Sequence, residues 1–297
     1  MPSRPQLRQL GVSTGKKARL HRILFQHGVG NGTALFLPYD QGLEHGPRDF
    51  FVNPAAADPA YITKLAIKGN FNGLAIQVGL AEKFYWDYAG EVPLVLKLNG
   101  KTDIPSDAEA LSPLHASVAD AVRLGADAVG YTMYVGSPAQ EKDFAQYRKV
   151  REAAHEYGMP LIVWAYPRGS AIEAKGGKDS FYAVDYAART ASELGADIVK
   201  VNFPRPELRQ GVRKEYDQDF SPQQAIDAVV RSANRTYVLV SGGEKAGDEA
   251  MLEKARQAME AGALGLIFGR NIWQRPYDES LVFIEQLQEI LAKYPAP

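Results

Sequence analysis

A lysine inside an apolar run is the residue in this sequence best suited to do chemistry. The run is Asp197–Phe203, and if it forms a strand, its alternate residues face opposite sides. One side is uniformly apolar and consists of Val199, Val201 and Phe203. The other side carries Lys200. A buried lysine loses hydration, which lowers its pKa from roughly 10.4, and the neutral amine is the species that forms a Schiff base with a carbonyl substrate.

A second amine has the same setting. Lys97 lies in the run Pro93–Leu98, with apolar neighbours on both sides. Either lysine could instead be structural and pair with a carboxylate that faces the same interior. The pattern alone does not decide which of the two is the nucleophile.

Aromatic and basic residues meet at the end of another apolar run. In Pro160–Tyr166, Trp164 and Tyr166 share one face, and Arg168 opens the loop that follows. At the carboxyl end of a barrel strand, such a run places a phenol and a guanidinium where active sites form. The alternative is that both aromatic rings only fill the interior.

A carboxylate follows the first apolar run. Asp40 comes directly after Ala34–Tyr39 and lies on the same alternation as Phe36 and Pro38. An inward carboxylate is costly without a cation, and we expect Lys200 to supply one. The alternative is that Asp40 only caps the turn before Gln41.

Glycines follow the last two apolar runs. Ser241, Gly242 and Gly243 end one run, and Gly269 and Arg270 end the other. Glycines expose backbone N–H groups that can cradle a phosphate, and arginine adds a forked set of donors. One such loop would be a weak signal, since glycines also turn corners, but the two together indicate phosphate binding.

Eight short apolar runs recur from residue 34 onward, and amphipathic helical stretches follow them. The runs are Ala34–Tyr39, Gly73–Val78, Pro93–Leu98, Asp127–Thr132, Pro160–Tyr166, Asp197–Phe203, Thr236–Ser241 and Leu264–Gly269. The helical stretches are Pro59–Lys68, Leu80–Tyr88, Ser117–Leu124, Gln140–Tyr157, Phe181–Leu194, Pro222–Ser232, Asp248–Ala261 and Asp278–Leu291. Buried parallel strands read as continuous apolar runs, so eight such units predict one α/β domain, a closed (β/α)8 TIM barrel over residues 34–297. An open doubly wound sheet is the weaker alternative, because no G-x-G-x-x-G follows the first run.

The composition excludes several classes of protein. With 45% hydrophobic and 23% charged residues, the chain is neither disordered nor fibrous, and a net charge of -1 argues against a nucleic-acid partner. No apolar run is long enough to span a membrane. The absence of cysteine and of a visible signal peptide points to the cytoplasm. The five histidines lack the spacing of metal ligands, so we expect no metal and no cofactor.

Residues 1–33 form a basic arm ahead of the predicted barrel. Acidic residues are absent from this segment, which contains six basic ones, Arg4, Arg8, Lys16, Lys17, Arg19 and Arg22. A mitochondrial transit peptide is also basic, but the prolines near the start and the scarcity of serine argue against one. We expect the arm to be helical or extended and to pack on the bottom of the barrel or on a neighbouring subunit.

Taken together, these segments resemble the archaeal-type class I fructose-bisphosphate aldolases. The resemblance rests on residues 37–46 (LPYDQGLEHG), 164–169 (WAYPRG), 197–204 (DIVKVNFP), 241–243 (SGG) and 268–271 (FGRN), and it extends from about residue 30 to the end of the chain. It implies a metal-independent barrel enzyme that cleaves fructose 1,6-bisphosphate reversibly into dihydroxyacetone phosphate and glyceraldehyde 3-phosphate, in glycolysis or gluconeogenesis.

The resemblance also implies roles for individual residues. Lys200 rather than Lys97 would form the Schiff base, Tyr166 would transfer protons, and Asp40 and Trp164 would lie beside the reacting carbons. The residues that would hold the 1-phosphate are Ser241, Gly242, Gly243, Gly269 and Arg270. His45 and Arg168 would lie toward the 6-phosphate. Members of this family are typically decamers or similar large homo-oligomers.

Two other functions stay open. A related Schiff-base lysine enzyme, either an aldolase-like transferase or a thiolase, could act on another phosphorylated ketose with the same barrel and the same lysine. A catalytically silent barrel that binds a phosphosugar is the remaining alternative, and the presence of Lys200, Tyr166 and Asp40 argues against it.

Overall fold

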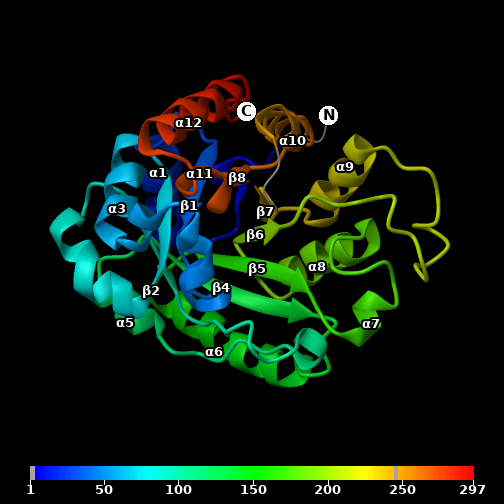
Figure 1. Cartoon of the computed structure of the whole chain (residues 1–297). Coiled ribbons are helices and arrows are strands. Elements are labelled where there is room, and N and C mark those ends of the chain that lie inside the picture. Colours follow the sequence, from blue (N-terminus) through cyan, green and yellow to red (C-terminus); the bar gives the residue numbers. More distant parts are fainter. Residues whose placement is uncertain (1–3, 244–246) are drawn as a thin grey trace.

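The chain folds into a closed barrel of eight parallel strands. The computed structural model describes residues 4–243 and 247–297, so the first three residues of the predicted arm lie outside the described residues. The strands are β1 (Ala34–Pro38), β2 (Gly73–Gln77), β3 (Leu94–Lys97), β4 (Ala128–Val135), β5 (Leu161–Pro167), β6 (Ile198–Val201), β7 (Tyr237–Ser241) and β8 (Gly265–Ile267). Each strand pairs in parallel with the next, and β8 pairs with β1, as predicted for a (β/α)8 TIM barrel (Figure 1).

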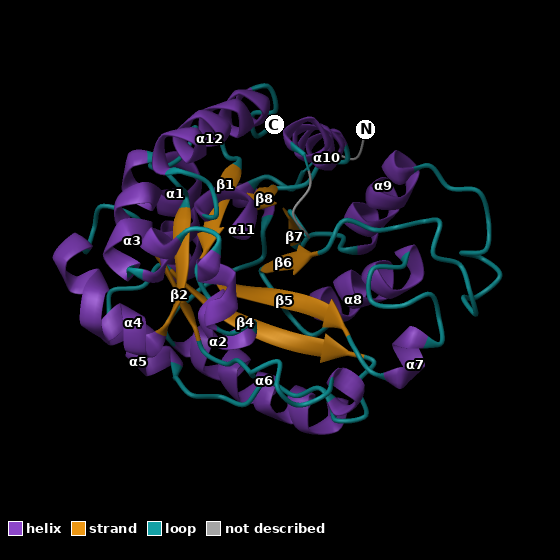
Figure 2. Ribbon diagram, viewed as in Figure 1, coloured by secondary structure: helices purple, strands orange, loops and turns teal. Residues whose placement is uncertain are grey.

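Helices surround the barrel and cover its outer surface (Figure 2). The long ones are α3 (Pro59–Lys68), α6 (Gln140–Glu156), α8 (Phe181–Glu193), α9 (Pro222–Ser232), α10 (Asp248–Glu260) and α12 (Tyr277–Ala292). The short ones are α2 (Gln41–Glu44), α4 (Val78–Leu80), α5 (Val118–Arg123), α7 (Ser170–Glu173) and α11 (Arg270–Trp273). Ser, Asp or Gly residues precede most of the long helices, and Ser180 and Ser221 each accept a hydrogen bond from a backbone N–H of the first turn.

The alternation of each strand divides the apolar core in two. Val199 and Val201 of β6 belong to the larger cluster, between strands and helices, whereas Ile198 belongs to a smaller cluster inside the barrel. Trp164 and Tyr166 of β5 also face the inside. The predicted orientation of both runs is therefore confirmed, and it places Lys200 inside the barrel.

The predicted boundaries are mostly correct within one to three residues. The main exception is Leu80–Tyr88, which was predicted to be one helix. It forms three short pieces instead, namely α4, a π-helical turn over Ala81–Tyr85 and a 3₁₀ turn over Trp86–Tyr88. The wide turn brings Tyr85 into the core, where its hydroxyl donates to the carbonyl of Val92 at 2.6 Å. A tertiary contact therefore overrides the local helical pattern.

The basic arm closes the amino-terminal end of the barrel. Its helix α1 (Thr14–Phe25) buries Leu20, Ile23 and Leu24 against the interior cluster. The guanidinium of Arg4 donates to the carbonyls of Ala263 and Leu264, both at 3.2 Å. Of the two expected packing sites, the arm therefore occupies the bottom of its own barrel. The division of the chain at residue 33 stays a prediction.

No helix within residues 4–243 and 247–297 is long and apolar enough to cross a membrane.

Candidate active site

A cavity of about 660 Å³ opens at the carboxyl ends of the strands. Most of the residues that the sequence singled out line it, namely Lys200, Tyr166, Ser241, Gly242, Gly243, Gly269, Arg270, His45 and Arg168. Asp40 and Trp164 do not line it, because both are almost fully buried. They lie one layer deeper, where each is close to a buried lysine. The barrel therefore brings together groups from β1, β5, β6, β7 and β8.

The two candidate lysines have different surroundings, although both are buried. The ammonium of Lys97 donates to Asp40 at 3.0 Å, to Glu44 at 2.8 Å and to the Thr132 hydroxyl at 2.8 Å. Burial alone would lower the pKa of Lys97, but the two carboxylates outweigh it and hold the pKa above its ordinary value. Lys97 is thus a permanent cation and the structural lysine of the pair.

Lys200 has no ion pair or hydrogen bond of its side chain within the described residues. Burial lowers the pKa of its amine to about 8, because desolvation outweighs the attraction of Asp40, and the nearby charge of Lys97 adds to the lowering. A substantial share of the amine is therefore neutral near physiological pH. Of the two lysines, Lys200 alone is prepared to act as a nucleophile.

Both amines lie beside the same aromatic ring. The Lys200 nitrogen lies 5.3 Å from the ring centre of Trp164, and the Lys97 nitrogen lies 4.6 Å from the same ring. Trp164 pairs in register with Lys200 across β5 and β6. Space for this arrangement comes from Gly130 of β4, where a Cβ atom would lie 2.7 Å from Trp164 and 2.8 Å from Lys97. Only glycine fits at this strand position.

Tyr166 is an acid or base that lies beside Lys200. The Lys200 nitrogen lies 5.1 Å from the centre of its ring. Burial raises the pKa of the phenol well above its ordinary value, and the negative charges of Asp40 and Glu44 raise it further. The phenol of the resting protein is therefore protonated.

The cationic partner of Asp40 differs from the expected one. The expectation was Lys200, but the direct contact of Asp40 is Lys97. Burial would raise the pKa of Asp40, whereas Lys97 and, less strongly, Lys200 hold it below its ordinary value. The physical reason is geometric, because Lys97 of β3 reaches Asp40 and Glu44 together and satisfies two carboxylates with one ammonium.

His45 and Arg270 share one carboxylate. Nδ1 of His45 lies 2.9 Å from Asp49, and a guanidinium nitrogen of Arg270 lies 3.7 Å from the same carboxylate oxygen. The two residues that were expected at opposite phosphates are thus neighbours of one group. Arg168 stands apart from them, in contact with Asp107 at 2.9 Å and 5.4 Å from the ring centre of Tyr166.

A polar chain supports the loop after β7. The Ser241 hydroxyl donates to the Asn202 side chain at 2.8 Å, and the Asn202 amide donates to Asp179 at 2.6 Å. The backbone of the loop is closely packed, since a Cβ atom at Gly242 would lie 2.7 Å from the amide nitrogen of Asn271. The carbonyl oxygens of the Asn271 and Gln41 side chains are buried without a hydrogen-bond partner among the described residues, and both residues line the cavity. These atoms are available to a ligand.

Sequence reasoning missed several of these residues. Glu44 belongs to the same motif as Asp40 and holds Lys97, but its position on the short helix α2 gave no sign of an inward direction. Asn202 lies on the same alternation as Lys200 in the run Asp197–Phe203, and this alternation could have identified it as a polar partner of Ser241. Asp179 comes from a loop and Asp49 from the 3₁₀ turn Pro47–Phe51, and no local pattern predicts their contacts.

Within the described ranges, no group of three or more His, Asp or Glu side chains could hold a metal ion. Whether the protein works without a metal or cofactor stays a prediction.

Known proteins with the same architecture are similar in sequence. A fructose-bisphosphate aldolase class 1 of Thermoproteus tenax is 40% identical over 261 residues, which cover 88% of this chain and 90% of that protein. A Methanocaldococcus jannaschii protein named fructose-bisphosphate aldolase/6-deoxy-5-ketofructose 1-phosphate synthase is 33% identical over 84% of this chain and 78% of its own length.

A solved structure supports the same relationship. An archaeal fructose-1,6-bisphosphate aldolase, whose catalytic lysine is covalently bound to the carbinolamine intermediate of the substrate, superposes with a TM-score of 0.79 at 38% identity. The match covers 92% of this chain and 99% of that one. The pattern of the DeoC/LacD family aldolases matches residues 34–275. This chain therefore belongs to the DeoC/LacD family of aldolases.

Proposed function

We propose that this protein is a class I fructose-bisphosphate aldolase. It cleaves fructose 1,6-bisphosphate reversibly into dihydroxyacetone phosphate and glyceraldehyde 3-phosphate through a Schiff base on Lys200. The observation that carries the proposal is the amine of Lys200, which burial keeps partly neutral beside Tyr166 at the floor of a cavity with a basic rim. The relatives at 33–40% identity, which are named as aldolases, support the same reaction.

The covalent step begins at the C2 ketone. Neutral Lys200 adds to C2 and forms a carbinolamine, which loses water to give a protonated imine. The positive nitrogen then accepts the electron pair of the C3–C4 bond as this bond breaks. Carbons 4 to 6 leave as glyceraldehyde 3-phosphate, and the product that stays on the enzyme is an enamine. Protonation of the enamine at C3 and hydrolysis release dihydroxyacetone phosphate and restore the amine.

Tyr166 is proposed to move the protons of the cleavage. The C4 hydroxyl must lose its proton as the C3–C4 bond breaks, and C3 must gain one afterwards. The phenol is protonated at rest, but a new iminium cation at Lys200 lowers its pKa, so the phenolate becomes accessible when the base is required. A Tyr166→Phe variant is expected to cleave substrate about 10²–10⁴-fold more slowly and still form the lysine adduct.

Asp40 and Trp164 are proposed to act from below the reacting carbons. Asp40 lies close enough to Lys200 to stabilise its cationic forms, and Lys97 holds that carboxylate in its ionised state. The indole of Trp164 packs beside the lysine and keeps water away from it. Together, the charge of Asp40 and the packing of Trp164 stabilise the iminium and protect it from solvent water.

The two phosphates are proposed to bind at the rim of the cavity. The 1-phosphate is held by Arg270 and by the backbone of the loops at Ser241–Gly243 and Gly269. The 6-phosphate is held at Arg168 and His45. Since His45 and Arg270 both contact Asp49, His45 also lies near the group proposed to hold the 1-phosphate. Binding of both ends holds the C3–C4 bond above Lys200.

The decisive test is reductive trapping. Incubation with dihydroxyacetone phosphate and borohydride is expected to attach a reduced adduct at Lys200, which peptide mass spectrometry locates. An adduct at Lys97 or at a surface lysine contradicts the assignment. Activity that is lost in EDTA and restored by zinc contradicts the proposed metal-independent chemistry.

A second candidate function is that of a related Schiff-base lysine enzyme, an aldolase, a transferase or a thiolase, that acts on another phosphorylated ketose. The double name of the Methanocaldococcus jannaschii relative favours it. Both functions use the same lysine and the same 1-phosphate loops, so trapping does not separate them. A panel of acceptor and donor sugars does, because the proposed aldolase loses most of its kcat/KM when the 6-phosphate is removed.

We also propose a cytoplasmic homo-oligomer, a decamer or a similar assembly, that works in glycolysis or gluconeogenesis. Phe51 and Ile104 support the assembly, since these apolar side chains are 78% and 88% exposed in the single chain. Sedimentation velocity tests this, and a monomer at micromolar concentration contradicts it.

A further inference from the structure

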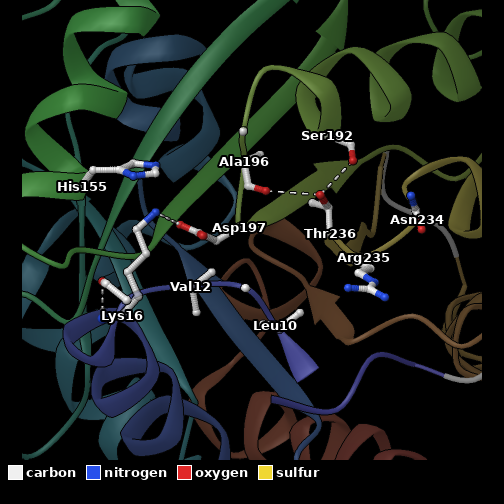
Figure 3. A pocket seen from close by; sticks show the side chains of 13 residues that line it. Leu10, Val12, Lys16, His155, Ser192, Ala196, Asp197, Asn234, Arg235 and Thr236 are labelled. Carbon is white, nitrogen blue, oxygen red and sulfur yellow. Dashed lines mark hydrogen bonds and ion pairs between the residues drawn. The ribbon is translucent and has the colours of Figure 1, made fainter. Parts of the chain in front are cut away.

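A second cavity lies at the amino-terminal end of the barrel, opposite the one that holds Lys200. Its volume is about 380 Å³, and it lies between residues 10–16 of the arm and the loops that lead into β6 and β7 (Figure 3). Its polar lining includes Lys16, His155, Asp197, Asn234 and Arg235. The catalytic proposal uses none of these side chains.

Lys16 is the central cation of this cavity. Its side chain is only 3% exposed, and its ammonium donates to Asp197 at 2.6 Å. An ammonium has three N–H donors, and within the described residues Asp197 is its one acceptor. The same oxygen of Asp197 also accepts the backbone N–H of Leu161 at 2.8 Å, so the carboxylate is already well satisfied. Two donors of a buried cation are thus left for something else.

Arg235 provides a second positive charge in the same cavity. Its side chain has no hydrogen bond or ion pair to the residues that the structure describes, and it is exposed. In Figure 3, Lys16 and Arg235 lie on either side of Asp197, and the amide of Asn234 lies next to Arg235. Asp197 is the one carboxylate among the described lining residues, so positive charge exceeds negative charge.

Helix ends at this site bring partial negative charge. Helices α6, α8 and α9 end here, and their carboxyl ends attract cations. Ser192 donates to the carbonyl of Ala233 at 2.9 Å, and Thr236 donates to the carbonyl of Ala196 at 3.2 Å, so these two carbonyls already have donors. The attraction for an anion therefore comes from the side chains of Lys16 and Arg235. Burial, and then the charge of Lys16, lower the pKa of His155, so a positive charge acts on its imidazole as well.

We propose that this cavity is a binding site for a small oxyanion with at least two negative charges, a phosphate ester or a dicarboxylate, held between Lys16 and Arg235. The ligand takes the free donors of Lys16 without displacing Asp197. The volume of the cavity lies at the lower end of the range for small-molecule sites. The site is separate from the aldolase cavity, and the inference does not depend on the proposed function.

The position of the site couples it to the catalytic strand. Asp197 precedes β6 directly, its carboxylate binds the first residue of β5, and its carbonyl accepts the backbone N–H of Tyr237 at the start of β7. Lys200 lies three residues further along β6. An anion that strengthens the Lys16–Asp197 arrangement stabilises the strands that carry Lys200 and Tyr166.

Calorimetric titration with inorganic phosphate and, separately, with malonate tests the proposal. The titrations use the wild-type protein, Arg235→Glu and a matched control, Arg231→Glu, which makes the same charge change outside the cavity. All are repeated in an Arg270→Gln background, which removes the guanidinium from the aldolase cavity. Binding that survives Arg270→Gln and Arg231→Glu but weakens at least about tenfold in Arg235→Glu is expected.

Equal affinity in the two glutamate variants overturns the proposal. So does the loss of all binding in the Arg270→Gln background, because the anion would then occupy only the aldolase cavity. Binding of phosphate alone or of malonate alone identifies which of the two oxyanion classes the site accepts. A conservative Lys16→Arg variant serves as a second measurement, since it keeps the pair with Asp197, and it is expected to retain binding.

Discussion

The surroundings of Lys97 and of Lys200 differ, although the two lysines have the same local sequence pattern. Both are buried in strands of one barrel and both lie beside the ring of Trp164. Lys97 has three hydrogen-bond acceptors, two of them carboxylates, whereas Lys200 has none within the described residues. Burial is thus common to both, and the presence of partners decides whether a buried amine is a structural cation or a nucleophile.

The comparison also explains why the two lysines are useful together. The charge of Lys97 lowers the pKa of Lys200, and Lys97 keeps Asp40 ionised. Asp40 in turn raises the pKa of Lys200, which reduces the neutral share of this amine. The same negative charge can stabilise the cationic intermediates that form on Lys200. Lys97 therefore lowers the pKa of the amine that we propose as the nucleophile.

The largest expected effect is on catalysis. Lys200→Met keeps the length of the side chain but removes the amine, so cleavage of fructose 1,6-bisphosphate is expected to fall by about 10⁴-fold or more. Steady-state rates measure this loss. Lys97→Met serves as the matched control, since it keeps the nucleophile, and it is expected to form the borohydride-reducible adduct at Lys200. An adduct that borohydride traps in Lys200→Met would contradict the distinction between the two lysines.

The next effect is on stability, and here the loss is expected from substitution of Lys97 and not of Lys200. Lys97→Met leaves Asp40 and Glu44 buried without their cation, so the free energy of unfolding is expected to fall by about 3–5 kcal/mol. Urea denaturation measures the change, with the exposed Lys68→Met as the control. A loss no larger than that of Lys68→Met would show that the buried ion pairs are not what distinguishes Lys97.

The pH dependence of the adduct sharpens the comparison further. Because burial lowers the pKa of Lys200 to about 8, the neutral share of this amine grows about tenfold for each pH unit up to about 8 and then levels off. Single-turnover rates of adduct formation are expected to follow the same curve. In Lys97→Met, the curve should move to higher pH, since a positive charge that lowers the pKa is gone. A curve that stays in place contradicts the tuning role of Lys97.

The smallest expected effect is a gain in stability. The pKa of Lys200 is lower in the folded protein than in the unfolded chain, so the unfolded chain binds the extra proton. Folding is therefore penalised below the unfolded pKa of roughly 10.4, and the penalty is complete below about pH 8. Lys200→Met removes this penalty and is expected to stabilise the protein by about 3 kcal/mol at pH 7. The gain should shrink as the pH rises above 8 towards the unfolded value. Thermal unfolding at several pH values measures it, and a loss of stability at pH 7 contradicts the account.

Much of the fold followed from hydrophobic periodicity. The eight apolar runs form eight parallel strands, because a strand that is buried on both faces is apolar at nearly every position. The alternation within Asp197–Phe203 correctly placed Lys200 inside. The stretch Leu80–Tyr88 was predicted less well, since the hydrogen bond from Tyr85 to Val92 depends on a contact outside the local pattern.

The sequence by itself determined the barrel, the inward direction of two lysines and the glycine loops at its rim, because each depends on residues that are neighbours along the chain. Only the tertiary structure decided that Asp40 and Glu44 bind Lys97, that Lys200 has no side-chain partner among the described residues, and that Asp49 joins His45 to Arg270. These contacts join side chains from different strands and loops. The pKa of a buried amine depends on all the charges within a few ångströms in space, so no pattern along the chain could assign the nucleophile.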